Sequence, residues 1–344
     1  MKIKVGNITK IKTGKLDANA SSPDGKYPFF TCSKEPLKIN SYSYDCECVL
    51  VAGNGDLNVK YFNGKFDAYQ RTYIIEDNSN GLLHIPYLYY FLENYIKELR
   101  KQSIGGVIKY IKLENLTEVS LELPTIAEQK RIVSIMETCS KLLISKNNVI
   151  EKMDLLTKAR FVEMFGDPII NPYGFPVKKI DEVAALNKGI TYSPDDISKE
   201  GIIVLRSGNI KGDAFDLEDI VRISKKISND KLVNENDILM CNRNGSVKLV
   251  GKVAKIPKLE EKMTFGTFMT IVRSDIFEYL FVFFQTSAFR EQIKFQTAVA
   301  INQISLPLLA SVKVPIPTNE LIKEFADFVH QVDKSKFIQM NSTI

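Results

Sequence analysis

Side chains capable of acid–base, metal or nucleophilic chemistry are few in this sequence, and their spacings do not fit such chemistry. The two histidines, His84 and His330, stand alone, and there is no His-Glu-x-x-His zinc helix. Cys46 and Cys48 have only Cys32 nearby, without the second pair of a typical zinc site. No Gly-x-Ser-x-Gly nucleophile elbow occurs. The sequence therefore predicts no catalytic residue and no metal site.

Two segments come close to nucleotide-binding motifs. Segment 245–252 resembles a P-loop, but five residues separate its glycines instead of four. Val253 also stands where the P-loop needs a magnesium-binding Ser or Thr. Segment 171–174 reads Asn-Pro-Tyr-Gly and lacks one proline of the Asn-Pro-Pro-Tyr loop of adenine methyltransferases. We interpret the first as a strand hairpin and the second as a turn. An enzyme with a degenerate cofactor site is an alternative that cofactor binding would test.

The polar chemistry of the chain lies instead in loops that combine basic, amide and hydroxyl side chains. Arg can bridge guanine O6/N7, Asn or Gln can bridge adenine N6/N7, and Lys contacts phosphate. Such loops occupy comparable places in both halves of the chain, as for Asn54 and Arg243, which favours a DNA-binding face. The candidate DNA-binding residues are Ser33, Lys34, Asn54, Asn58, Lys60, Gln70, Arg71, Gln102, Lys109, Tyr110, Arg206, Ser207, Asn209, Lys211, Asn242, Arg243, Ser246, Lys248, Gln296 and Gln303.

A heptad pattern predicts one long helix in the middle of the chain. Thr125 and Glu128 form a capping box at its start, and Gly166-Asp167-Pro168 is a stop signal. Its apolar positions step by three and four, with Lys146 in the slot between Leu142 and Val149, and they are Ile132, Ile135, Cys139, Leu142, Val149, Met153 and Leu156. We expect about 40 residues, a rod of roughly 60 Å, built to pair with another helix. A long core helix is the alternative interpretation.

An internal repeat links the two halves of the chain. Aligning Pro124-Thr125 with Pro317-Thr318 brings upstream apolar positions into register, and 87–92 resembles 279–284. A second helix follows the second Pro-Thr, with heptad positions Ile322, Phe325, Val329 and Val332. We expect the two helices to pair antiparallel as a coiled coil. The second has only about 22 residues, roughly 33 Å, so it covers part of the first, or the full coil needs partner subunits.

These elements predict an α+β fold with two globular units and a pseudo-twofold internal repeat. Each unit is expected to hold a small mixed or antiparallel sheet with helices, and the coiled coil separates the units. The predicted boundaries are 1–123, 124–166, 167–317 and 318–344.

Composition and charge agree with a globular protein and decide little else. The chain has 344 residues, of which 44% are hydrophobic, which excludes wholesale disorder, collagen and a disulfide miniprotein. A net charge of +5 is too small to argue for or against DNA. The odd cysteine count fits no disulfide framework. We see no signal peptide and no membrane span, and therefore expect a cytoplasmic protein that does not bind membranes.

Segment 121–133 reads Leu-Glu-Leu-Pro-Thr-Ile-Ala-Glu-Gln-Lys-Arg-Ile-Val. It resembles the strand–Pro–Pro-Leu-Ala-Glu-Gln-Lys-Arg-Ile signature of type I restriction–modification specificity (S) subunits. Segment 102–111 resembles the Gly-containing segment that ends each target recognition domain of that family. The resemblance covers the whole chain. In the second copy, 317–323, only Pro, Thr, Lys and the apolar positions survive.

The resemblance implies a DNA sequence-specificity subunit without catalysis of its own. The domains would be target recognition domain 1 (1–123), a central conserved helix (124–166), target recognition domain 2 (167–317) and a distal conserved helix (318–344). Each recognition domain would read one half of a bipartite, asymmetric double-stranded DNA target, and the coiled coil would set the spacer. The expected partners are two modification (methyltransferase) subunits and restriction (translocase/nuclease) subunits. S-adenosylmethionine, ATP and Mg are expected on those partners. The alternatives are an S-like protein of an unusual or fused restriction system, or a coiled-coil protein-interaction scaffold.

Overall fold

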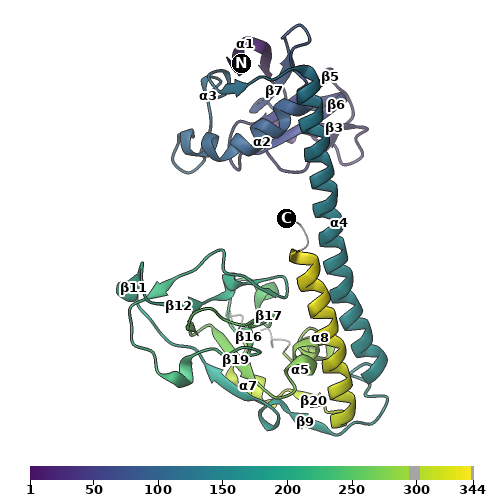
Figure 1. Cartoon of the computed structure of the whole chain (residues 1–344), viewed down its shortest axis with the longest axis vertical. Helices are drawn as coiled ribbons and strands as arrows, with labels where there is room; N and C mark the ends of the chain where they lie inside the picture. Colours follow the sequence, from purple (N-terminus) through teal and green to yellow (C-terminus); the bar gives the residue numbers. More distant parts are fainter. Residues whose placement is uncertain (294–302, 342–344) are drawn as a thin grey trace. The chain divides into compact units, whose positions relative to one another are not determined.

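The computed structural model describes residues 1–293 and 303–341. The chain divides into two compact units, Met1–Ser145 (unit 1) and Lys146–Ile344 (unit 2). Each unit contains sheets and helices (Figure 1). The predicted mixture of sheets with helices is confirmed.

Unit 1 is built on one six-stranded sheet. Its elements are β1 (Lys2–Lys4), α1 (Val5–Ile8), β2 (Thr9–Thr13), η1 (Ala18–Ala20), β3 (Tyr27–Phe30), β4 (Leu37–Ile39), β5 (Tyr44–Ala52), β6 (Val59–Ala68), β7 (Thr72–Asp77), α2 (Ile85–Gln102), α3 (Glu114–Thr117), β8 (Ser120–Glu122) and the first part of α4 (Ile126–Phe165). The strand order is β2-β7-β5-β6-β3-β4, and only β3 and β6 run parallel. β1 pairs antiparallel with β8.

The central strand β5 is buried on both faces. Val49 and Val51 belong to the core that contains Leu88 of α2, whereas Cys48 and Leu50 belong to the core on the other face. This alternation follows from the two-residue period of a strand. Because β5 contributes to a core on each face of the sheet, its consecutive residues Cys48–Ala52 are all apolar.

Unit 2 has several smaller sheets. Its elements are the rest of α4, β9 (Val177–Lys179), η2 (Ile180–Glu182), β10 (Ala185–Lys188), η3 (Pro194–Asp196), β11 (Ile197–Ser198), β12 (Ile202–Leu205), η4 (Ser207–Asn209), β13 (Ile210–Lys211), β14 (Ala214–Phe215), β15 (Arg222–Ile223), η5 (Asn229–Lys231), β16 (Ile238–Cys241), η6 (Val247–Leu249), β17 (Val253–Lys255), β18 (Met263–Phe265), β19 (Met269–Arg273), α5 (Phe277–Phe283), α6 (Ser287–Gln292), α7 (Leu306–Ser311), β20 (Lys313–Pro315) and α8 (Asn319–Asn341).

The strand order of unit 2 repeats that of unit 1. Its sheet β10-β19-β16-β17 matches β2-β7-β5-β6, and β9–β20 matches β1–β8. Val49 pairs with Ile75 in unit 1, as Ile238 pairs with Val272 in unit 2. A parallel pair follows in both units, β3 with β6 and β12 with β18. The predicted internal repeat is confirmed.

The long helix α4 has 40 residues, as predicted. The Glu128 backbone N–H donates to Thr125 Oγ1 at 3.4 Å at its start. Gly166 follows its last residue with a φ of 71°, which favours glycine. No helix within residues 1–293 and 303–341 is long and apolar enough to cross a membrane.

Within unit 2, α8 lies antiparallel along the last turns of α4 (Figure 1). Arg160 pairs with Glu324 at 2.8 Å, and Lys336 pairs with Asp154. The Phe325 ring packs against Phe161 and Phe165. On α8 the predicted heptad positions are all buried, and they are Ile322, Phe325, Val329 and Val332.

On α4 the heptad prediction was partly wrong. Leu156 is 51% exposed, whereas Phe161 and Phe165, which the pattern did not include, are buried against α8 and α5. A straight helix has 3.6 residues per turn and drifts away from a strict 3.5-residue seam. The predicted positions Ile132, Val149 and Met153 are half-buried.

Three further predicted seam positions, Ile135, Cys139 and Leu142, are exposed. The Lys336–Asp154 pair lies near the end of α8. Since each residue adds about 1.5 Å, α8 is too short to cover these three positions.

Candidate nucleic-acid interface

In unit 1, three segments that carry predicted DNA-binding residues are joined at one end of the sheet. The Gly53 N–H donates to the Arg71 carbonyl at 2.8 Å, which joins the β5–β6 loop to the β6–β7 turn. The Gly55 N–H donates to the Lys109 carbonyl at 2.9 Å, and Asn54 forms an antiparallel β-bridge with Tyr110. The segment after α2 is therefore held beside both loops.

The loop after β3 belongs to the same cluster. Asn58 Nδ2 donates to the Cys32 carbonyl at 2.8 Å, which brings the neighbouring Ser33 and Lys34 to this end of the sheet. Lys60 Nζ bonds the Asn58 side chain, and burial lowers the pKa of Lys60. Asn58 and Lys60 therefore hold the loops in place.

Gln102 has a structural role in the folded chain. Its Nε2 donates to the Tyr95 hydroxyl at 3.4 Å, and its Oε1 accepts from Asn115 Nδ2 at 3.2 Å. Within the described ranges, the predicted residues of unit 1 whose side chains have no hydrogen-bond or ionic partner are Asn54, Gln70, Arg71, Lys109 and Tyr110.

Unit 2 repeats this arrangement. The Asn242 N–H donates to the Phe268 carbonyl at 3.0 Å, and the Ile304 N–H donates to the Asn242 carbonyl at 2.8 Å. Arg243 and Gln303 form an antiparallel bridge, as Asn54 and Tyr110 do in unit 1. The sequence repeat predicts that position 243 in unit 2 is equivalent to position 54 in unit 1. The equivalent backbone bridges confirm this correspondence.

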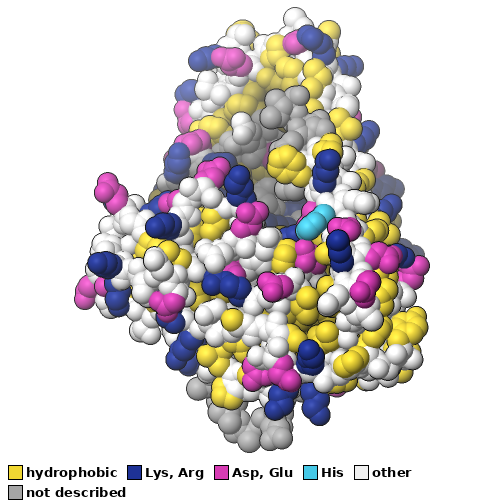
Figure 2. Space-filling model, turned by 60° about the horizontal axis from the view of Figure 1, so that its bottom comes forward, with side chains coloured by type: hydrophobic (Ala, Val, Ile, Leu, Met, Phe, Trp, Pro, Cys, Tyr) yellow, Lys and Arg dark blue, Asp and Glu magenta, His cyan; other side chains and the backbone are white. Residues whose placement is uncertain are grey.

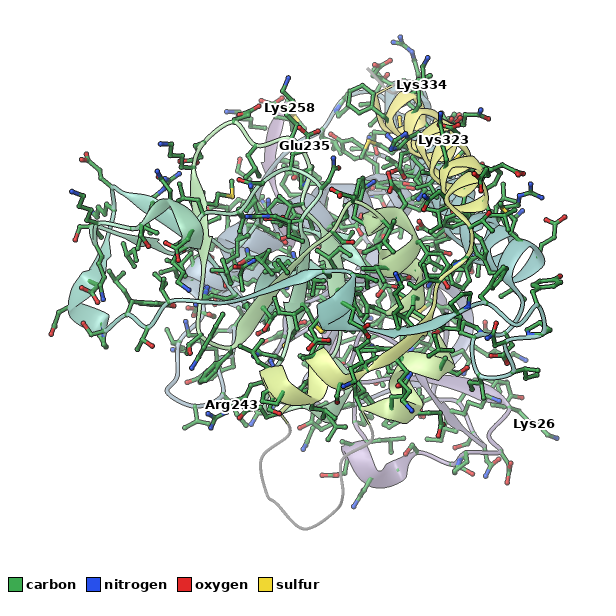
Figure 3. All side chains as sticks on the ribbon, turned by 90° about the horizontal axis from the view of Figure 1, so that it is seen from below. Lys26, Glu235, Arg243, Lys258, Lys323 and Lys334 are labelled. Atoms are coloured by element: carbon green, nitrogen blue, oxygen red, sulfur yellow. The ribbon has the colours of Figure 1, made fainter. Side chains whose placement is uncertain are left out.

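Arg243 is a basic residue of this cluster, and Lys188 lines the same pocket. Its guanidinium lies over the ring of Phe268, 4.9 Å from the ring centroid. The pair borders a pocket of about 370 Å³ that Asn242 and Gln303 also line. Figure 3 shows Arg243 on the side of unit 2 opposite Lys258. Sequence reasoning missed Phe268, although it stands at the repeat position of Arg71.

Asn209 was wrongly predicted as a DNA contact. It is fully buried, and its Oδ1 accepts from the Arg206 N–H at 2.8 Å. Its Nδ2 donates to the carbonyls of Asp216 and Asp219 at 2.9 and 3.0 Å. All of these bonds are internal, so Asn209 closes the turn after β12 and is not accessible to a ligand.

Two basic residues near Asn209 are neutralised by acids. Arg206 pairs with Asp219 at 2.9 Å, and Lys211 bonds Glu218 and Asp216. The Glu218 and Asp216 carboxylates raise the pKa of Lys211. These ion pairs weaken the case for direct DNA contacts here.

The remaining predicted residues of unit 2 surround the β16–β17 connection. Ser207 accepts from Asn244 Nδ2 at 3.1 Å, which ties the loop after β12 to the loop after β16. Ser246 and Lys248 are exposed, and Asn242 is buried. The P-loop-like segment is the predicted hairpin between antiparallel strands. Gln296 lies outside the described residues.

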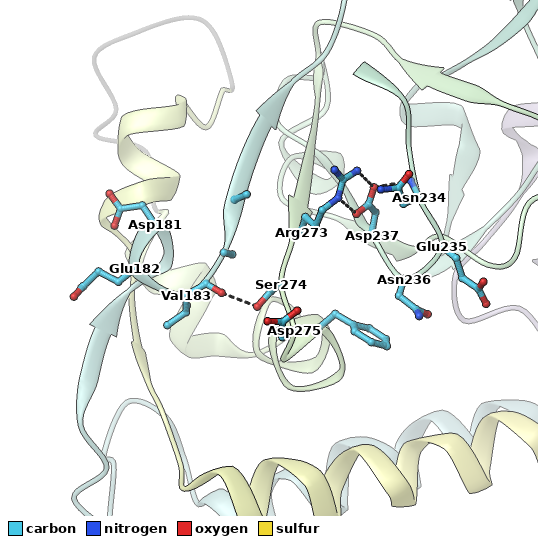
Figure 4. Close-up of a pocket in the computed structure, with 13 residues that line it drawn as sticks. Asp181, Glu182, Val183, Asn234, Glu235, Asn236, Asp237, Arg273, Ser274 and Asp275 are labelled. Carbon is cyan, nitrogen blue, oxygen red and sulfur yellow. Dashed lines mark hydrogen bonds and ion pairs between the residues drawn. The ribbon is translucent and has the colours of Figure 1, made fainter. Parts of the chain in front are cut away.

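A larger pocket in unit 2 has the wrong charge for DNA. It measures about 760 Å³ and is lined by acids including Asp181, Glu235 and Asp275 (Figure 4). Its buried Asp237 receives two 2.7 Å bonds from Arg273. Since DNA phosphates need cationic partners, we do not assign nucleic acid to it. On the face shown in Figure 2, basic and acidic side chains are interspersed.

The described residues offer little to metal or thiol chemistry. No group of three His, Cys, Asp or Glu within 1–293 and 303–341 could hold a metal ion. Burial raises the pKa of Cys46, Cys48 and Cys241, which disfavours the reactive thiolate.

Comparison with known proteins relates the chain to one family. The family model described as the type I restriction modification DNA specificity domain matches residues 1–152 and 172–344. The EcoDI specificity subunit of Escherichia coli is 39% identical over 156 residues, 45% of this chain and 34% of the relative. The MjaVIII specificity subunit of Methanocaldococcus jannaschii is 19% identical over 306 residues, 83% of this chain and 72% of the relative.

A second bacterial relative shows similar partial coverage. The StySPI specificity subunit of Salmonella potsdam is 28% identical over 178 residues, 48% of this chain and 38% of the relative. The matches therefore span little more than a third of the EcoDI and StySPI subunits.

A solved structure shares the fold across the full chain. The S subunit of a type I restriction–modification system from M. genitalium has a TM-score of 0.57 at 15% identity, over 99% of this chain and 91% of that chain. The family model covers most of the sequence and recurs in both halves, in agreement with the repeated strand order. The chain therefore belongs to the type I restriction modification DNA specificity domain family.

Proposed function

We propose that this chain is the DNA sequence-specificity subunit of a type I restriction–modification complex and has no catalytic activity of its own. Each unit reads one half of a bipartite target through the loop cluster at the end of its sheet. The main support is the pair of equivalent bridges, Asn54–Tyr110 and Arg243–Gln303, which place base-reading residue types at the same point of two repeated folds.

The two half-sites differ, because the equivalent positions carry different chemistry. An amide at Asn54 suits adenine, whereas the guanidinium of Arg243 suits guanine. An asymmetric target follows from two similar folds with different loops.

The helices α4 and α8 form an antiparallel coiled coil that sets the spacer between half-sites. In this proposal, target recognition domains 1–123 and 167–317 are joined by conserved helices 124–166 and 318–344. The exposed apolar positions Ile135 and Leu142 on α4 provide a surface for two modification subunits. S-adenosylmethionine, ATP and Mg belong to the modification and restriction subunits, and the complex works in the cytoplasm.

Methylome sequencing of the host with and without this gene tests the function. We expect one bipartite methylated motif to disappear on deletion and to return on complementation. An unchanged methylome would contradict the proposal. If DNA-binding measurements show no preference for one bipartite site, the protein-interaction scaffold is favoured. If the motif is methylated by a fused system, the S-like protein of an unusual restriction system is favoured.

A further inference from the structure

The two loop clusters share corresponding backbone bonds. The Gly53 N–H in unit 1 donates to the carbonyl of Arg71, in the turn before β7. The Asn242 N–H in unit 2 donates to the carbonyl of Phe268, in the turn before β19. The residue that follows each donor, Asn54 or Arg243, is bridged to the segment before α3 or α7. Position 54 therefore corresponds to 243, and position 71 corresponds to 268.

The side chains at these positions differ between the units. Unit 1 has an amide on the loop and an arginine on the turn, whereas unit 2 has an arginine on the loop and an aromatic ring on the turn. Phe268 is 50% exposed, which is unusual for a phenylalanine unless its ring has a task at the surface. Here the ring supports the guanidinium of Arg243 from one side.

Arg243 is free to act on a ligand. In residues 1–293 and 303–339 its side chain contacts no acidic partner, in contrast to Arg206 and Lys211. The contact with the Phe268 ring restricts where the guanidinium can lie, and bidentate bonds to guanine O6 and N7 need a well-placed guanidinium.

The pocket beside Arg243 contains an unsatisfied amide. Asn242 is 6% exposed and its Oδ1 has no hydrogen-bond partner in the described chain. A buried polar atom without a partner is costly. A ligand edge or a bound water that enters this pocket would satisfy it. The unsatisfied amide is a second, independent indication of a binding position.

We propose that Arg243, supported by Phe268, reads one guanine in the half-site of unit 2, and that Asn54 and Arg71 form the equivalent reading position of unit 1. The proposal rests on the function proposed above. It assigns the difference between the half-sites to four residues.

The test is the methylome of a deletion host complemented with single variants. Arg243→Ala should relax one guanine position in one half of the motif, with selectivity for that base reduced about 5- to 150-fold. Arg243→Lys keeps the charge but loses the bidentate fork, so it should relax the same position. Phe268→Ala should relax that position less, and Phe268→Tyr should keep it. Asn54→Ala and Arg71→Ala should relax a position in the opposite half.

Lys258→Ala is the matched control, because it removes an exposed cation from the opposite side of the same unit (Figure 3). We expect its motif and extent of methylation to match the unmutated gene. A strict motif with Arg243→Lys, or uniform loss at an intact motif with Arg243→Ala, would make Arg243 a phosphate contact and overturn the proposal. Relaxation in different halves by Arg243→Ala and Phe268→Ala would also overturn it. If the unmutated gene restores no motif, the proposed function itself fails.

Discussion

Gln129 shows how one side chain anchors the long helix α4 to unit 1. It is fully buried, and its Oε1 accepts from the His84 N–H at 2.8 Å. Its Nε2 donates to the carbonyls of Leu82 and Pro124 at 2.8 and 2.9 Å. The Gln of the Ala-Glu-Gln-Lys-Arg-Ile segment thus joins the first turn of α4 to the residues before α2.

Replacing Gln129 by Leu should destabilise unit 1 by about 1–3 kcal/mol, because buried backbone groups lose their partners. Urea unfolding of the full chain, followed by circular dichroism, measures the change. Lys130→Ala on the exposed side of the same turn is the control, with an expected change within about 0.5 kcal/mol. Equal stability of the two variants would show that Gln129 does not anchor the helix.

Single residues also show where sequence reasoning reaches its limit. Asn209 and Arg243 lie in similar polar loops after buried strands, so both were predicted to contact DNA. Asn209 closes its own turn through carbonyls that follow it by seven and ten residues. An amide that closes a turn and an amide that reads a base have the same polarity. Only the conformation of the folded chain distinguishes the two roles. The internal repeat was more informative, since it related position 243 in unit 2 to the equivalent position, Asn54, in unit 1.

The pairing of α4 with α8 is the clearest case at the scale of elements. The apolar period predicted both helices and the buried face of α8. It misplaced Leu156, because a helix with 3.6 residues per turn drifts away from a strict 3.5-residue seam. The neighbouring Leu155 is exposed as well. The buried face of α4 includes Phe161 and Phe165, which meet Phe325 and Tyr279 of unit 2.

Phe325→Ala should lower the free energy of unfolding of unit 2 by about 3–5 kcal/mol, because it leaves a cavity among packed rings. Phe337→Ala is the control on the same helix, since Phe337 is 67% exposed, and we expect a change within about 0.5 kcal/mol. Chemical denaturation of both variants gives the comparison. A small effect of Phe325→Ala would mean that α8 contributes little to the core of unit 2.

At the scale of the whole chain, the repeat was predictable and the sheet pairing was not. Pro-Thr, apolar strands and heptad helices recur in order, so one alignment located both copies. The parallel pairs β3–β6 and β12–β18 join strands far apart in sequence, and apolar alternation carries no information about such partners. The predicted boundary before α4 also differs from the division of the chain after Ser145, because Gln129 and Phe161 place the two ends of one helix in different units.

Because α4 runs through both units, its length should control the spacing of the two half-sites. Inserting one helical heptad between Leu142 and Val149 lengthens α4 by about 10 Å and changes its phase by only about 20°. At 3.4 Å per base pair, we expect the spacer of the methylated motif to grow by about three base pairs, with both half-sites unchanged. Host methylome sequencing reads out the spacer directly.

The same seven residues inserted between Pro257 and Lys258, in the connection from β17 to β18, are the control for this prediction. That insertion adds equal chain length without lengthening α4, so the original spacer should persist. An unchanged spacer with the α4 insertion would rule out the helix as the ruler. A change with the loop insertion would show that the spacer depends on unit 2 itself, since that insertion leaves the length of α4 unchanged.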